Sequence, residues 1–150
     1  MIQRIQTLYL FLVVVLGTLL CFFSPVQFLP ATGTDYITLT SFAKWPLAVI
    51  TVAVPLIALV DIFLFKRRLL QARINVVNVV LCVGYYALLA LYIAFVVKGY
   101  EPVDNVVLTG ADWYPTPWAS IPLVNMILTL MATRRILKDE ALVRAADRLR

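Results

Sequence analysis

The chain alternates between four long apolar segments and shorter polar stretches. The apolar segments cover residues 7–29, 45–65, 74–97 and 117–133, and each is close to the roughly 20 residues that cross the hydrocarbon core of a bilayer. Lipid offers no hydrogen-bonding partner, so a backbone that spans it must satisfy its own polar groups, as an α-helix does. The segments also lack the apolar–polar alternation of barrel strands. The pattern therefore predicts an all-α membrane protein whose single domain is a bundle of four transmembrane helices.

The composition supports lipid as the solvent of these segments. Of the 150 residues, 63% are hydrophobic and 14% are charged, and the mean hydropathy is +0.93. A soluble domain is about half apolar and about one quarter charged. The chain therefore carries more apolar surface than one water-soluble core would bury.

The sequence contains no recognisable catalytic or metal-binding constellation. It has no histidine, which excludes Ser-His and Cys-His catalysis, histidine-ligated haem and most zinc sites. It also has no Cys-x-x-Cys pair and no glycine-rich phosphate loop. Cys21 and Cys82 lie in apolar segments at depths about 8 Å apart, which is too far for a disulfide. We therefore predict a non-enzymatic protein with no catalytic residue, metal or cofactor.

Basic residues are concentrated on one side of the predicted bundle. The chain has 13 lysines and arginines, and all but Lys44 and Lys98 fall near the N-terminus, in the connection 66–73 or in the tail 134–150. The positive-inside rule places these three segments, and hence both termini, in the cytoplasm. Tryptophan is enriched at membrane boundaries, and the predicted outer boundary carries all three tryptophans, Trp45, Trp113 and Trp118.

The polar connections differ in character on the two sides. The connection 66–73 has neither glycine nor proline and predicts a tight antiparallel helical hairpin. Glycine and proline recur in the outer connections, where two β-prone runs, 36–40 and 105–109, are candidates for a small paired sheet. The tail 134–150 contains no helix breaker, so the fourth helix is expected to extend into the cytoplasm.

The cytoplasmic connection and tail are the predicted docking surfaces. Their basic side chains suit anionic lipid headgroups, and the tail alternatively suits a protein partner. Nucleic acid is not expected, because the tail has no aromatic residue to stack on bases. The basic residues concerned are Lys66, Arg67, Arg73, Arg134, Arg135, Lys138, Arg144 and Arg148.

Each apolar segment carries one stripe of small or polar residues at steps of three or four, which places the stripe on one helix face. Helices in lipid associate through such faces, so the stripes predict one packed bundle. The stripes are Gly17, Cys21 and Ser24; Thr51, Pro55, Ala58 and Asp61; Asn75, Asn78, Cys82 and Tyr85; and Pro122, Asn125 and Thr129.

Asp61 is the only charged residue well inside a predicted span, about 6 Å from its inner boundary. Asn75 and Asn78 lie at a similar depth on the next helix, so we expect Asp61 to contact these amides and a basic group, Arg68 or Arg73. An intramembrane carboxylate is a functional hypothesis by default. It either locks the hairpin through an arginine or snorkels to water, or it binds a proton or cation in a transporter.

Three segments of the chain resemble one protein family. They are MIQRIQTLYL at 1–10, FKRRLLQAR at 65–73 with Asn75 and Asn78 behind it, and ILKDEALVRAADRLR at 136–150. The chain is similar to small four-helix inner-membrane proteins of Bacteroidota that are known only as a domain of unknown function. The resemblance covers nearly the whole chain and implies a single multi-pass domain in a Gram-negative inner membrane. It supplies no activity, substrate or site.

The leading functional hypothesis is a small accessory or structural subunit of a larger complex in the bacterial inner membrane. Its expected partners are anionic lipid headgroups and other membrane-protein subunits. Two alternatives remain: a small oligomeric transporter or channel that uses Asp61, and a protein that binds anionic lipids through its basic cytoplasmic residues.

Overall fold

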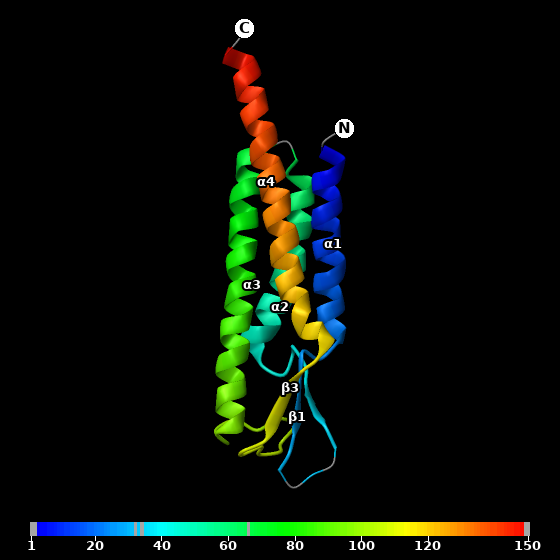
Figure 1. Cartoon of the computed structure of the whole chain (residues 1–150), viewed down its shortest axis with the longest axis vertical. Coiled ribbons are helices and arrows are strands. Elements are labelled where there is room, and N and C mark those ends of the chain that lie inside the picture. The colour runs from blue at the N-terminus through cyan, green and yellow to red at the C-terminus, as the bar shows by residue number, and fades with distance from the viewer. Residues whose placement is uncertain (1–2, 32, 34, 66, 149–150) are drawn as a thin grey trace.

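The computed structural model describes residues 3–31, 33, 35–65 and 67–148, and within these ranges it shows four long helices and a small sheet at one end (Figure 1). The elements in chain order are α1 (Gln3–Phe22), β1 (Val26–Leu29), β2 (Ile37–Leu39), α2 (Trp45–Phe63), α3 (Arg68–Val97), β3 (Asp112–Pro115), the 3₁₀ helix η1 (Pro117–Ser120) and α4 (Ile121–Arg148). We call the end where α1 begins and α4 finishes the terminal end, and the opposite end the sheet end.

The four helices form an up-and-down bundle. The packed pairs are α1 with α2, α2 with α3, α3 with α4, and α4 with α1, so each helix has two neighbours. Each of the four is long and apolar enough to cross a membrane. The prediction of a bundle of four helices, each long and apolar enough to span a membrane, is therefore confirmed.

The predicted stripes form the inside of the bundle. All of the stripe residues of α2, α3 and α4 are buried, and so is Gly17 of α1. Large apolar side chains such as Phe11, Val49 and Val80 are exposed on the opposite faces. Helices that pack in lipid are expected to place small and polar residues inside the bundle and large apolar residues outside it.

The first apolar segment does not remain helical to residue 29, as its sequence predicts. The helix α1 ends at Phe22, and Val26–Leu29 form a strand instead. Ser24 and Pro25 separate the two elements, and proline cannot continue a helical hydrogen-bond ladder. The interrupted backbone is held by Thr116, whose N–H donates to the Pro25 carbonyl over 3.0 Å and whose hydroxyl donates to the Ser24 carbonyl over 2.6 Å.

The outer sheet exists, but its pairing differs from the prediction. Its strand order is β2–β1–β3, and both pairings are antiparallel, with Phe28 opposite Ile37 on one side and Trp113 on the other. The run 36–40 supplies β2 as expected, whereas 105–109 contributes only the isolated bridge between Val103 and Val106 in the described chain. The central strand comes from the end of the first apolar segment, which is why the predicted partner was wrong.

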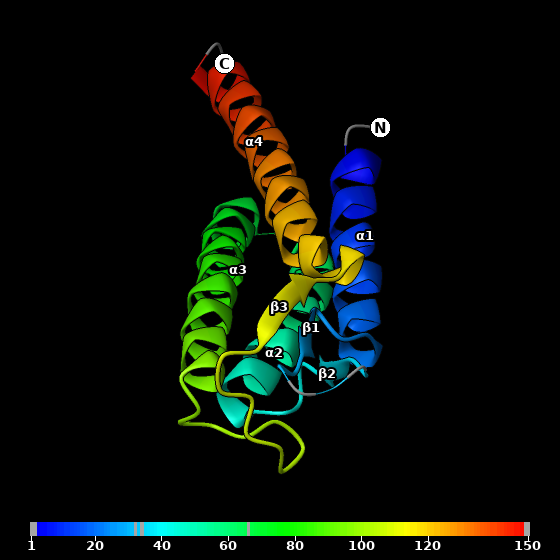
Figure 2. The ribbon, with the colours of Figure 1, turned by 60° about the horizontal axis from the view of Figure 1, so that its bottom comes forward.

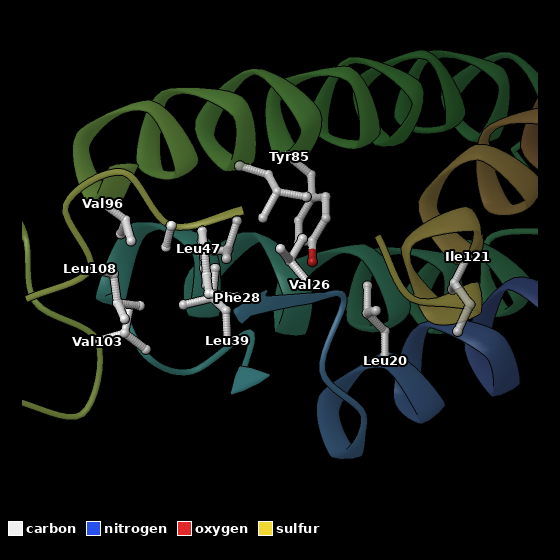
Figure 3. Close-up of a cluster of buried hydrophobic side chains, with 12 residues drawn as sticks. Leu20, Val26, Phe28, Leu39, Leu47, Tyr85, Val96, Val103, Leu108 and Ile121 are labelled. Carbon is white, nitrogen blue, oxygen red and sulfur yellow. The ribbon is translucent and has the colours of Figure 1, made fainter. Parts of the chain in front are cut away.

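The sheet lies beyond the ends of α1, α2 and α4 and beside the last turns of α3 (Figure 1 and Figure 2). Phe28 and Leu39 of the sheet are fully buried, together with Leu47 of α2, Tyr85 of α3 and Leu108 of the following loop. These side chains converge from separate elements (Figure 3). Val26 and Phe28 of β1 thus fill a core at the sheet end, and residues 26–29 do not complete a span.

At the terminal end, the helices continue as the sequence indicates. The helix α2 ends at Phe63 and α3 begins at Arg68, inside the connection 66–73, as the predicted helical hairpin requires. The helix α4 runs without interruption to Arg148 and extends past the ends of α1 and α3 (Figure 1). The side-chain amide of Gln6 donates to the Asp139 carboxylate, which fastens α1 to this extension.

Candidate functional site: a buried polar cluster

The last turn of α2 places Asp61 inside the bundle. Asp61 follows Thr51, Val54 and Ala58 at helical spacing, and all of these residues are buried on the same face. Asp61 itself has an exposed fraction of 0%. A charged side chain rarely lies in such a position unless it is paired or has a function.

The neighbouring helix α3 supplies three amides to the same region. Gln71, Asn75 and Asn78 lie at steps of four and three residues and are 4%, 1% and 0% exposed. The Gln71 side-chain N–H donates to the backbone carbonyl of Asp61 over 3.1 Å. The side chains of Asn75 and Gln71 both approach the Asp61 carboxylate. We call Asp61, Gln71, Asn75 and Asn78 the polar cluster.

Most of the polar atoms of this cluster lack a hydrogen-bond partner. Within the described chain, no hydrogen bond of normal geometry reaches either carboxylate oxygen of Asp61 or either side-chain amide atom of Asn75 and Asn78. Buried polar groups are nearly always paired in folded proteins, and an unpaired buried group costs about 1–3 kcal/mol. A concentration of unpaired groups at one place is therefore the feature of this bundle that most needs an explanation.

The basic partner expected for Asp61 is not found. Among the described residues, neither Arg68 nor Arg73 forms an ion pair with Asp61; Arg68 is half-exposed and Arg73 is exposed. The predicted contact with Asn75 is supported, because the Asn75 side chain approaches the carboxylate. Gln71 was missed, although its position four residues before Asn75 puts it on the same face.

The remaining basic residues line the terminal end. Arg67 and Arg68 border an open pocket of about 320 Å³ together with Leu69, Leu70, Glu140 and Val143. Arg144 pairs with Glu140 at 3.1 Å, and Arg134, Arg135 and Lys138 are exposed. Lys66 lies outside the described residues, as does the side chain of Arg148, which belongs to α4.

A second charged site lies at the sheet end. Lys44 forms an ion pair with Glu101, and its ammonium stands 5.5 Å from the centre of the Tyr92 ring. The hydrogen bond to Glu101 raises the pKa of Lys44 above its ordinary value. Both partners border a pocket of about 230 Å³ between α2 and α3 whose other walls are mainly apolar.

The bundle interior also contains a small cavity nearer the sheet end. Its volume is about 10 Å³, and its walls include Thr51, Cys82, Tyr85 and Asn125. This is about the space of one water molecule. The side-chain oxygen of Asn125 lacks a partner in the described chain, so a single water there would satisfy it.

The described residues offer no group of three or more His, Cys, Asp or Glu side chains suited to a metal ion. Cys21 and Cys82 are both free thiols, as their depths predict.

The fold and the polar cluster define the class of protein. It is a bundle of four helices, each long and apolar enough to span a membrane, with a small sheet at one end. The family model of DUF4293, a domain of unknown function, matches residues 2–149. The chain belongs to this family, which confirms the resemblance of its sequence to a domain of unknown function. No curated protein and no solved structure matches the chain.

Proposed function

We propose that this protein is a non-enzymatic integral membrane protein of the bacterial inner membrane that acts as a small accessory subunit of a larger complex. The observation that carries the proposal is the extension of α4 beyond the other helices. Its residues Leu137, Leu142 and Val143 are exposed by 48%, 57% and 44%, and Val143 borders the open pocket that α4 shares with Arg67 and Arg68.

The chemistry of the extension suits a partner protein with an acidic cytoplasmic surface. Arg134, Arg135, Lys138 and Arg144 are exposed on the same stretch of α4 as these apolar residues, and Arg144 pairs with Glu140. A surface that combines apolar contacts with a charged rim is typical of protein docking sites. The contact of Gln6 with Asp139 supports this role, because it holds the extension in a fixed direction relative to the bundle.

The proposed orientation has the terminal end in the cytoplasm. This end carries Arg67, Arg68 and the basic residues of α4, whereas the sheet end carries the three tryptophans. The positive-inside rule favours this orientation. The docking extension would then meet cytoplasmic domains of its partner complex.

A site-specific crosslinking experiment tests this function. A photo-crosslinking residue at position 142 should capture a membrane-protein subunit that also co-purifies stoichiometrically in mild detergent. The double variant Leu142→Ser/Val143→Ser should lose this subunit, whereas Val107→Ser, at an exposed apolar position of the sheet end, should retain it. A protein that purifies only as itself, with no crosslink at position 142, would refute the proposal.

Binding of anionic lipid is the second candidate function, favoured by the pocket between Arg67, Arg68 and α4. Guanidinium groups beside exposed Leu69 and Leu70 suit a phosphate headgroup with its acyl chain. Native mass spectrometry after reconstitution with phosphatidylglycerol should show retained lipid. The double variant Arg67→Gln/Arg68→Gln should lose it, and equal retention by the variant would rule this role out.

A further inference from the structure

We propose that Asp61 is a proton-binding site in the folded bundle. The carboxylate takes up one proton from water at the terminal end and forms an O–H bond, which changes the charge of the side chain from −1 to zero. The new O–H then donates a hydrogen bond to the amide oxygen of Asn75. This site goes beyond the accessory-subunit function and does not depend on it.

The first step of the argument is the absence of a compensating charge in the described chain. The ion pairs there are Lys44 with Glu101 and Arg144 with Glu140, and neither involves Asp61. The helix α2 packs against α1 and α3. On α3 the nearest charged residues are Arg68, which is half-exposed, and Arg73, which is exposed; on α1, Tyr9 is half-exposed and the side chain of Arg4 lies outside the described residues.

The second step is the chemistry of the side chains that surround the carboxyl group. Those that approach it, Asn75 and Gln71, are neutral amides. An amide cannot neutralise a carboxylate, but its oxygen accepts a hydrogen bond from a protonated acid, and its N–H groups donate to the carbonyl oxygen of that acid. The Asn75 amide nitrogen can donate to Asp61 in either protonation state, whereas its unpaired amide oxygen gains Asp61 as a donor only when the acid is protonated.

The third step favours a proton over a metal cation. A hard cation such as Na⁺ or Ca²⁺ prefers several oxygen ligands and often keeps water. The polar cluster has a single carboxylate and is almost completely buried, and the small cavity beside Thr51 and Asn125 lies elsewhere in the bundle. A proton needs one acceptor and no cavity.

The position of Asp61 gives the proton a short path to water. Asp61 lies in the last turn of α2, and its backbone carbonyl accepts from the N–H of Leu64 in the following turn, over 3.1 Å. The next residue, Phe65, is exposed. One helical turn, about 5 Å, therefore separates the carboxyl group from the exposed turn of the chain. Gln71, which contacts Asp61 from α3, lies on the same side of the cluster.

Infrared spectroscopy of the full chain in lipid nanodiscs tests the proposal directly. At neutral pH we expect a C=O stretching band of a protonated carboxylic acid that shifts in D₂O. The band should vanish in Asp61→Asn and persist in Asp112→Asn, which removes an exposed carboxylate of β3. In Asn75→Ala the band should persist at a higher frequency, because the hydrogen bond of the acid is lost. Absence of the band in the wild type, or its persistence in Asp61→Asn, would overturn the proposal.

Thermal unfolding distinguishes a proton site from a metal-cation site at Asp61. It also shows whether the Asp61→Asn variant is folded. Asparagine has the shape of a neutral aspartic acid, so Asp61→Asn should keep the Tm of the wild type. Replacing choline by Na⁺ at constant ionic strength should leave both Tm values unchanged. A rise in Tm that depends on Na⁺ and is lost in Asp61→Asn would overturn the proposal in favour of a sodium site. Partner crosslinking at position 142 reports independently on the accessory-subunit function.

Discussion

Gly17 of α1 meets the ring of Pro55 of α2 so closely that a Cβ atom on Gly17 would lie 3.1 Å from two atoms of that ring. Both residues are buried. Proline lacks the N–H that would bond the carbonyl of Thr51, so this part of α2 has a weakened helical ladder. The glycine lets α1 pack directly against this segment, in the way that small residues allow close helix contacts in lipid.

The first prediction concerns this contact. Gly17→Ala should lower the stability of the bundle by about 1–3 kcal/mol, because the proline ring is rigid and the helices must move apart. Gly84→Ala is the matched control, since its Cβ would meet only Ile50, at 3.9 Å, and alanine favours helix. Thermal unfolding in detergent measures both variants. Equal Tm values for the two variants would show that the close contact contributes nothing.

The second prediction compares two glycines in the loop at the sheet end, where alanine would cause backbone strain at both positions and a steric clash at only one. Gly99 and Gly110 have φ angles of +76° and +71°, a conformation that costs other L-residues about 1–2 kcal/mol. A Cβ on Gly99 would also collide with the Thr109 hydroxyl, whereas one on Gly110 would meet nothing within 4 Å. We expect Gly99→Ala to lower the Tm clearly more than Gly110→Ala. A larger effect at Gly110 would contradict this account.

The third prediction concerns Tyr86, which joins α3 to the beginning of α4. Its hydroxyl donates to the carbonyl of Ala119 over 2.6 Å and accepts from the backbone N–H of Leu123 over 3.1 Å. Leu123 is the third residue of α4, so the hydroxyl acts as an N-terminal cap. Tyr86→Phe should cost about 1–3 kcal/mol because both groups lose their partner.

Tyr100→Phe is the control for this variant, because the Tyr100 side chain is 75% exposed. It should leave the Tm unchanged. Hydrogen exchange should also increase at the first turn of α4 in Tyr86→Phe. An unchanged exchange rate there would show that the hydroxyl does not cap the helix.

The fourth prediction uses the pKa of Lys44, which the hydrogen bond to Glu101 raises. Because the pKa is higher in the folded state, the stabilisation is fully present below the ordinary pKa of lysine and is lost as the pH rises through the raised value. The side chains are 36% and 39% exposed, so solvent screening limits the contribution to about 0–1 kcal/mol. In Glu101→Gln the Tm should fall less between neutral and strongly alkaline pH than in the wild type. An equal fall in Tm at alkaline pH for the variant and the wild type would contradict the prediction.

The sequence predicts the helical spans and their inner faces well because lipid imposes simple rules on length and packing. The burial of Thr51, Ala58, Asn78 and Asn125 follows from their spacing alone. The strand at Val26–Leu29 could not be distinguished from the end of a span, because it is mostly apolar and follows the first span closely. Its identity depends on tertiary pairing with β2 and β3.

For the polar cluster, the sequence reveals how deep each residue lies in the bundle but not which side chains contact each other. The depths of Asp61 and Asn75 follow from their positions along α2 and α3, so their proximity was predictable. The rotation of each helix decides which polar group reaches Asp61, and hydropathy does not determine that rotation. Gln71 therefore takes the place in which an arginine was expected.

The fifth prediction tests the orientation of the bundle in the membrane. Cys21 and Cys82 are free, so a Cys21→Ser/Cys82→Ser background allows single cysteines to be placed at either end. Arg67→Cys at the terminal end and Val107→Cys at the sheet end replace side chains that are both exposed. The reagent is a maleimide that passes the outer membrane but not the inner membrane. It should label position 107 in intact cells and position 67 only after lysis, because basic segments remain in the cytoplasm. Labelling of position 67 in intact cells would invert the orientation, and the extension of α4 would then face the periplasm and could not meet a cytoplasmic partner.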